Sequence, residues 1–403
     1  MSDLHPAFEP AFDPAFDSPA GRRRDARRAR RRMRGRQARQ LVQQQARRAL
    51  IGEAPAIGVD IGGTKVAAGV VDAWGKVVAR TRRDTPTASA QAVEDVIAEV
   101  VEELAAEHDV VSVGIGAAGF VDAERSSVLF SPHLAWRNEP LREAVERRIR
   151  ERLGRRIGRR TVVENDANAA AWAEYRFGAG EGESRLVCVT LGTGIGGGMV
   201  TSGRLQRGRF GIAGEFGHMV LVPGGHRCEC GNRGCWEQYA SGNALVREAR
   251  ELVRSTSPMA RHLRSVVDGD ADALDGPQIT QAARDGDPLS IELIADVGRW
   301  LGVGLAGMAA AFDPGCIIIG GGLSEAGDLL IDPTRQAFSR SLTGRGHREE
   351  PVIVRAALGP NAGFIGAADM ARSAARRSRR VRRARDRRPL RRLFERPGSS
   401  ETP

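Results

Sequence analysis

Side chains that bind metal ions are concentrated in one short stretch of the chain, residues 214–237. Three thiolates and one imidazole form a closed tetrahedral set, which is the usual ligand set of a structural zinc ion. The four candidate ligands are His218, Cys228, Cys230 and Cys235. Two carboxylates, Glu215 and Glu237, flank them. A structural zinc rarely needs such neighbours, so the pattern predicts a metal knot that also shapes a binding site.

Core packing and a disulfide are weaker interpretations of the clustered cysteines. Lone cysteines are mostly small core residues, which fits Cys188 and Cys316 in their apolar surroundings. A disulfide inside the cluster would leave an odd thiol and would need an oxidising compartment. The N-terminus shows no apolar signal core, and no segment reaches the roughly 18 apolar residues of a membrane span. We therefore expect a cytoplasmic protein with no membrane contact.

Glycine-rich turns follow three apolar segments that we predict to be buried strands, at 56–60, 186–191 and 316–319. Backbone N–H groups of glycines can line a nest for anions, and a flat base or ribose can approach a glycine backbone closely. Three such turns predict a nucleotide held between two lobes. Their residues are Asp60, Gly62, Gly63, Thr64 and Lys65, then Gly192, Thr193 and Gly194, and finally Gly320, Gly321 and Gly322.

The second turn, which we predict over Gly192–Gly198, has the spacing G-x-G-x-x-G. In a dinucleotide-binding fold a helix must follow that spacing. Here we expect Gly198–Thr201 to continue as a returning strand, so the pattern excludes that fold. No G-x-x-x-x-G-K-[ST] segment occurs either, which excludes a P-loop protein.

An acidic residue stands where a predicted strand, 161–163, meets a helix of small residues, 169–173. Asp166 at this junction can accept a hydroxyl proton and orient the oxygen for in-line attack on a phosphate. Asn165 can hydrogen-bond a neighbouring hydroxyl. The local alternative is a helix N-cap, where Asn and Asp are favoured. The phosphate-binding turns nearby favour the acid–base role.

Strands and helices alternate between the two ends of the chain, and each half opens with a strand, a glycine turn and a second strand. Apolar residues at helical spacing predict one helix over 93–104 and a long one from about 291 to 312, which Asp313-Pro314 ends. This order predicts the α/β class, with two related α/β domains around a central cleft that holds the ligand.

Basic residues are concentrated at the two ends. Residues 1–52 hold 13 Arg against 5 acidic residues, and residues 371–403 hold 13 Arg against 3. The net charge is +11, so the segment between them carries −7. Runs of like charge stay disordered unless a polyanion neutralises them. We expect solvated tails, with weak, salt-sensitive polyanion contact as the alternative. Neither tail interleaves aromatic residues with its arginines, as a single-strand binder would.

The combined motifs resemble those of the ROK family (repressors, open reading frames, kinases), and most closely its actinobacterial glucokinases. The segments that carry the resemblance are Asp60–Lys65, Glu164–Asn168, Leu191–Gly198, Gly214–His218 and Cys228–Glu237, with Gly234–Gly242 the most characteristic. The resemblance covers about 55–370 and neither tail. It implies an actin-like, ribonuclease-H-like ATPase fold.

The resemblance also implies the domain boundaries. A small α/β domain would span 54–164, and a helix at about 361–371 would return to it. A large α/β domain with the zinc motif would span 165–360. The disordered Arg-rich tails would be 1–53 and 372–403.

By the same resemblance, Asp166 would be the general base acting on the 6-hydroxyl of a hexose. The residues that would contact the sugar are Gly119, Asn165, Asp166, Glu215, His218 and Glu237. The glycine turns would hold Mg-ATP, with Asp60 near the magnesium ion, and His218 would bind zinc together with the three cysteines. Dimers and tetramers are common in the family, so a homo-oligomer is expected. His133 departs from the family, which commonly has Asn at that position, and leaves the identity of the hexose open.

Two classes of function compete. The first is an ATP-dependent glucokinase that converts glucose to glucose 6-phosphate. The second is a sugar-responsive transcriptional repressor of the same family. Such repressors carry a winged-helix DNA reader, for which residues 1–52 are too few and too rich in Arg. The repressors can also lack the catalytic Asp, whereas Asp166 is present here. A variant of the first class would phosphorylate N-acetylmannosamine, N-acetylglucosamine or fructose, or would use polyphosphate as donor.

Overall fold

The computed structural model describes residues 54–86, 89–132, 134–154, 157 and 161–386, and side chains only as far as residue 375. The predicted tail 1–53, the end of the other tail and His133 lie outside this range. The described residues, which begin at Ala54, form one compact unit. It contains two five-stranded sheets, each with its own hydrophobic core.

The first sheet has the strand order β3-β2-β1-β4-β8. Its strands are β1 (Ala56–Ile61), β2 (Lys65–Val71), β3 (Val77–Asp84), β4 (Val113–Ala117) and β8 (Thr161–Asn165). Helices α2 (Ala90–Glu107) and α3 (Leu141–Leu153) bury their apolar faces against it. A small sheet lies beyond β4 and consists of β5 (Phe120–Val121), β6 (Val128–Phe130) and β7 (Arg137–Glu139).

The second sheet repeats this plan in the order β11-β10-β9-β12-β13. Its strands are β9 (Arg185–Leu191), β10 (Ile195–Thr201), β11 (Arg204–Leu205), β12 (Cys316–Gly320) and β13 (Val352–Arg355). In both sheets an antiparallel hairpin is followed by two parallel strands. This duplication confirms the two related α/β halves predicted from the sequence and is the actin-like arrangement that the family resemblance implied.

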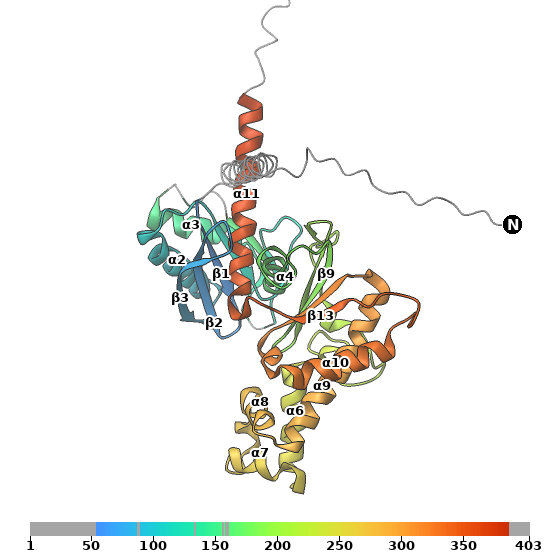
Figure 1. Cartoon of the computed structure of the whole chain (residues 1–403). Helices are drawn as coiled ribbons and strands as arrows, with labels where there is room; N and C mark the ends of the chain where they lie inside the picture. The colour runs from blue at the N-terminus through green and yellow to red at the C-terminus, as the bar shows by residue number, and fades with distance from the viewer. Residues whose placement is uncertain (1–53, 87–88, 133, 155–156, 158–160, 387–403) are drawn as a thin grey trace, which may run out of the picture. The chain divides into compact units, whose positions relative to one another are not determined.

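Helices of the second half cover its sheet and extend away from it (Figure 1). The pair α9 (Pro288–Phe312) and α10 (Asp328–Ser341) packs on the sheet, and α6 (Gly242–Arg254), α7 (Arg261–Val266) and α8 (Gly276–Arg284) form the far end. The short segments are η1 (Phe216–His218), α5 (Glu237–Ala240), η2 (Pro258–Ala260), η3 (Ala271–Ala273), η4 (Gly322–Ala326) and η5 (Gly359–Asn361).

Two helices join the halves. Helix α4 (Asp166–Phe177) starts directly after β8 and packs on β9 and β10. Helix α11 (Ala362–Asp386) runs alongside α4 and the first sheet (Figure 1). Its backbone approaches that sheet so closely that a β-carbon at Gly58 or Gly114 would overlap a carbonyl of α11.

The returning helix is longer than predicted. The expected disordered tail from residue 372 is wrong for residues 372–386, because α11 continues to Asp386. Arg372 is buried beside Asp369, with their side chains 2.5 Å apart. Ala and Arg are strong helix formers, so composition alone did not distinguish this stretch from a charged tail.

The second glycine turn is shorter than predicted. It contains only Gly192–Gly194, because β10 begins at Ile195 rather than at Gly198. A β-carbon at Gly198 would collide with Ala171 of α4. The later glycines therefore let a helix pack against the strand. The predicted outcome holds: a strand, not a helix, follows the turn.

One described helix, α9, is long and apolar enough to cross a membrane, contrary to the expectation that no segment would be. Yet 61% of its apolar window is buried in the protein, and it forms the core of the second half.

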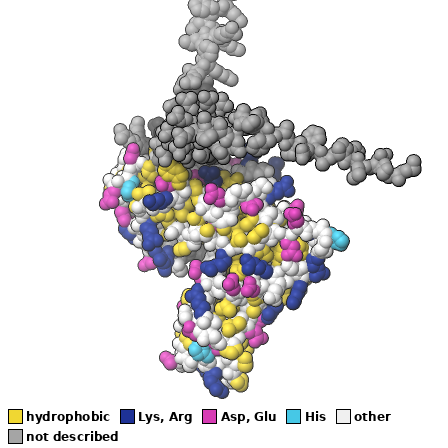
Figure 2. Space-filling view, in the orientation of Figure 1, with side chains coloured by type: hydrophobic (Ala, Val, Ile, Leu, Met, Phe, Trp, Pro, Cys, Tyr) yellow, Lys and Arg dark blue, Asp and Glu magenta, His cyan; other side chains and the backbone are white. Residues whose placement is uncertain are grey.

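Acidic and basic side chains are interspersed on the face that Figure 2 shows.

Candidate functional site

Asp166 is the first residue of α4. The N-cap of that helix is Asn165, whose side-chain oxygen accepts a hydrogen bond from the backbone N–H of Asn168 at 2.9 Å. Asp166 therefore does not serve as the cap. Its Oδ1 accepts hydrogen bonds from Asn165 Nδ2 at 3.0 Å and from the backbone N–H of Ala167 at 2.9 Å. These two bonds orient the carboxylate.

The predicted sugar-side residues from the first half meet at this point. Asn165 Nδ2 also donates to the carbonyl of Gly119 at 3.2 Å. Gly119 has a φ of 138° at the start of β5, a conformation that side chains disfavour. The end of β8 and the start of β5 are thus held together next to Asp166.

Glu215 approaches from the second half, just before the short helix η1. Burial is the main cause that raises its pKa to about 7, and the neighbouring charges of Asp166 and Glu237 raise it further. Three of the predicted acidic residues therefore lie near one another. Such a group can accept hydrogen bonds from several hydroxyls of one polyol.

Asp60 lies near the end of β1 and is a neighbour of Asp166. Burial and the charge of Asp166 raise its pKa to about 8. The two carboxylates line a cavity of about 170 Å³ together with Gly320 and Gly321 from the end of β12. Carboxylates at such a place are the ligands by which proteins hold Mg²⁺ next to phosphates.

The remaining glycine turns lie at hairpins. The first joins β1 to β2, where Gly62 N–H donates to the carbonyl of Lys65 at 2.9 Å and Thr64 and Lys65 are exposed. The second joins β9 to β10, where Thr193 and Gly194 line a second cavity of about 480 Å³. Gly62, Gly63, Thr64, Lys65, Gly192 and Gly322 are not among the lining residues of either cavity.

The larger cavity connects the second turn with the metal knot. His218, Cys230 and Glu237 line it with Thr193, and the aromatic rings of Phe120 and Phe130 stand at its edge. Oε2 of Glu237 accepts a hydrogen bond from the backbone N–H of Ile195 at 2.9 Å. This carboxylate is therefore fixed by the first residue of β10, directly after the turn that was predicted to bind the nucleotide.

The four predicted metal ligands converge. Their ligand atoms all lie within 4.8 Å of one another. His218 Nδ1 lies 3.6 Å from Cys228 Sγ, and the sulfurs of Cys230 and Cys235 are 3.6 Å apart. Two thiolates on one tetrahedral zinc, each about 2.3 Å from the ion, would be about 3.8 Å apart. The donor set and its spacing therefore fit zinc.

Two charged residues close to this site in the fold, Glu164 and Arg207, were not predicted from the sequence. The Glu164 side chain is only 1% exposed and forms ion pairs with Arg207 and Arg125. Glu164 was within a recognised motif but received no role, and Arg207 was not singled out. An acidic residue two positions before the candidate base was the available signal for Glu164; Arg207 had none, because 43 residues separate it from its partner.

The chain is similar to known proteins over most of its length. The family model described as ROK family matches residues 56–374. The glucokinase of Streptomyces coelicolor is 49% identical over 316 residues, which cover 78% of this chain and 97% of the relative. The glucokinase of Thermotoga maritima is 38% identical, over 78% of this chain and 96% of the relative.

A solved structure is similar as well. The crystal structure of a ROK family glucokinase from Streptomyces griseus, in complex with glucose and AMPPNP, has a TM-score of 0.72 and 48% sequence identity. The match covers 79% of this chain and 99% of that one.

Proposed function

The chain belongs to the ROK family, and from this premise we propose that it is an ATP-dependent glucokinase. It transfers the terminal phosphoryl group of ATP to the 6-hydroxyl of glucose. The observation that carries the proposal is that Asp166 is a neighbour of two groups of residues. Asn165, which also binds the Gly119 carbonyl, donates a hydrogen bond to it, and Glu215 is a charged neighbour. Asp60, Gly320 and Gly321 line a cavity with it.

The chemistry follows from that position. The Asp166 carboxylate accepts the proton of the sugar 6-hydroxyl as its oxygen forms a bond to the terminal phosphorus of ATP. The bond between that phosphorus and the bridging oxygen breaks, and ADP leaves with the electron pair. Asn165 and Ala167 hold the base in one orientation, so proton transfer requires little rearrangement.

Asp60 is assigned to the magnesium side of the nucleotide. Its raised pKa reflects burial near another carboxylate, and a divalent cation would relieve that repulsion. When bound, Mg²⁺ would neutralise charge on the phosphates. Gly320 and Gly321 leave room for the nucleotide at the end of β12, and the β9–β10 turn supplies Thr193 and Gly194 from the other cavity.

Glu215, Glu237 and His218 are assigned to the sugar hydroxyls. A zinc ion held by His218, Cys228, Cys230 and Cys235 would orient the imidazole. Since Nδ1 faces Cys228, Nε2 is the ring atom left for the sugar. The zinc would thus be structural by coordination and would set specificity by its position.

A phosphorylation assay of the purified chain tests the proposal. A panel of glucose, mannose, fructose, N-acetylglucosamine and N-acetylmannosamine is offered with ATP and, separately, with polyphosphate. We expect the largest kcat/KM for glucose with ATP. Turnover of another sugar, or with polyphosphate alone, would redirect the assignment. No turnover of any sugar would refute the kinase and favour the repressor alternative. Light scattering of the same sample tests the expected dimer or tetramer.

Metal removal tests the knot. We expect one equivalent of zinc per chain by elemental analysis. Titration with a chelator should weaken glucose binding before the protein unfolds. Cys228→Ser should reproduce that loss, whereas Cys188→Ser, in the core of the second sheet, should keep its zinc. If sugar binding and folding are lost together, the zinc site only stabilises the fold and has no separate role in sugar binding.

A further inference from the structure

Glu164 is a buried carboxylate at the end of β8, two residues before the proposed base. Its Oε1 accepts hydrogen bonds from the backbone N–H of Asn165 at 3.0 Å and from Asn168 Nδ2 at 3.3 Å. Asn165 and Asn168 are also joined to each other by the N-cap bond of α4. The position of Glu164 therefore fixes the first turn of the helix on which Asp166 lies.

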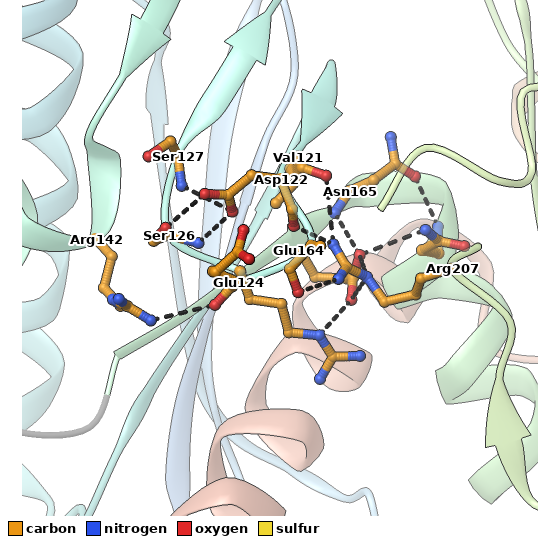
Figure 3. A network of polar contacts seen from close by, with 12 residues as sticks. Val121, Asp122, Glu124, Ser126, Ser127, Arg142, Glu164, Asn165 and Arg207 are labelled. Atoms are coloured by element: carbon orange, nitrogen blue, oxygen red, sulfur yellow. Dashed lines mark hydrogen bonds and ion pairs between the residues drawn. The ribbon is translucent and has the colours of Figure 1, made fainter. Parts of the chain in front are cut away.

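Arg207 binds this carboxylate from the second half of the chain (Figure 3). Its Nε lies 2.9 Å from Glu164, and its side chain is 10% exposed. The rest of the guanidinium donates to three consecutive carbonyls at the end of β5 and just beyond it, those of Val121 at 3.4 Å, Asp122 at 2.9 Å and Ala123 at 3.0 Å. One planar cation thus joins the end of β8 to the segment that follows Gly119.

Arg207 also begins the segment that leads to Glu215. The carbonyl of Arg207 accepts a hydrogen bond from the backbone N–H of Ala213 at 3.1 Å, which closes a compact loop. Gly211 within that loop has a φ of 91°, and a β-carbon there would collide with the backbone of Val121 to Ala123. The loop is therefore seated directly on the same segment that the guanidinium binds.

We propose that Arg207 is a positioning residue for the sugar site. Resting on the proposed function, the inference is that this side chain sets the spacing between two sugar-binding groups. One group is Gly119 and Asn165 in the first half, and the other is Glu215 in the second. Arg207 belongs to neither of the lined cavities and acts through Glu164 and the 121–123 carbonyls.

A selective kinetic effect follows. Without Arg207, the two sugar-binding groups lose their common anchor. A displacement of about 1 Å at such a site can lower the reaction rate about 100-fold. The hydrogen bonds and ion pairs given for Arg207 and Glu164 are to Arg125, Asn165, Asn168 and the 121–123 carbonyls, and none of these residues is assigned to the nucleotide. Arg207→Ala should raise the KM for glucose about 10-fold or more and leave the KM for ATP within about 2-fold. Folding should survive, because Arg125 still pairs with Glu164 at 3.0 Å.

Two further variants sharpen the test. Lysine has no planar fork and cannot serve a carboxylate and three carbonyls together, so Arg207→Lys should not restore the KM for glucose. Millimolar methylguanidinium should partly restore it in Arg207→Ala. The matched control is Arg142→Ala, whose guanidinium donates to the next carbonyl of the same segment, that of Glu124, at 3.3 Å in an exposed position. Its KM values should match those of the wild type.

All variants are compared with a wild type that turns over glucose, so a failure of the proposed function is recognised first and separately. An unchanged KM for glucose in folded Arg207→Ala would overturn the inference, and so would equal increases in both KM values. If Arg207→Ala does not fold, the double variant Arg207→Met with Glu164→Gln removes both charges and is held to the same two criteria.

Discussion

Glu164 and Asp369 lie beside arginines, whereas Asp60 and Glu215 lie beside other carboxylates. Asp369, on α11, accepts a hydrogen bond from Trp172 at 2.8 Å and forms ion pairs with Arg372 and Arg176. For Asp60 and Glu215 the neighbouring charges are all negative, and burial together with this repulsion raises the pKa of each well above its ordinary value.

The contrast distinguishes carboxylates that hold the fold together from carboxylates of the proposed active site. The paired carboxylates tie helices α4 and α11 and the neighbouring strands into one structure. The carboxylates that repel one another lower the stability of the folded protein when they are ionised. The charge of a bound Mg²⁺ and the hydroxyls of a bound sugar would offset that loss. Loss of Asp369 should therefore mainly lower stability, and loss of Asp60 or Glu215 should mainly lower activity. Glu164 is paired but lies two residues before Asp166, so its pair with Arg207 also affects the proposed sugar site.

The largest effect on stability is expected for Asp369→Asn. Arg372 has a side chain only 3% exposed and would lose its buried counter-charge. Breaking such a buried pair costs about 3–5 kcal/mol, measured as the free energy of unfolding in denaturant. The KM values for glucose and ATP should stay within 2-fold of the wild type. The matched control is Asp332→Asn, which breaks an exposed pair with Arg335 and should cost about 0–1 kcal/mol. A changed KM for glucose in Asp369→Asn would contradict the claim that Asp369 affects stability alone.

Asp60→Asn should do the opposite: activity is lost and stability gained. The folded-state pKa of Asp60 is about 8, above the ordinary value of 3.8. A raised acidic pKa costs stability progressively as pH rises from the ordinary value to the folded value. In Mg²⁺-free buffer, the excess melting temperature of the variant over the wild type should therefore be small at pH 5 and larger at pH 8. An excess that shrinks with rising pH would contradict the placement of Asp60.

The smallest effect is expected at the ends of the chain. Truncation after Asp386, with or without removal of residues 1–50, should leave kcat and both KM values within 2-fold.

Truncation after Ala371 should lower stability as much as Asp369→Asn does, because it removes Arg372 and its hydrogen bonds to the carbonyls of Val71 and Asp72. Equal stability of the two truncations would show that the buried pair contributes little.

The sequence predicted the parts of the site that local chemistry specifies. The spacing of His218 and the cysteines predicted four side chains that do converge, and the strand-to-helix junction predicted a role for Asp166, which is the first residue of α4. Repetition of a strand, a glycine turn and a strand indicated the two related sheets. Each of these motifs is contained in a short stretch of the chain.

Contacts between distant residues left no such signal. Trp172 and Asp369 are 197 residues apart, and Arg207 and Glu164 are 43 apart. Their pairing depends on how α11 and the loop before Glu215 dock. Among many arginines, the residues that would be buried could not be distinguished from solvated ones. The end of α11 was missed for the same reason, since burial of Arg372 is decided by tertiary packing.

Asp166→Asn tests the central claim most directly. The substitution keeps the size of the side chain and an oxygen that can accept the hydrogen bonds from Asn165 and Ala167, but removes the base. Glucose affinity, measured by calorimetry, should stay within about 3-fold, and kcat should fall about 1,000-fold or more, as expected for loss of a general base. A kcat within 10-fold of the wild type would contradict the assignment of Asp166 and, with it, the proposed mechanism.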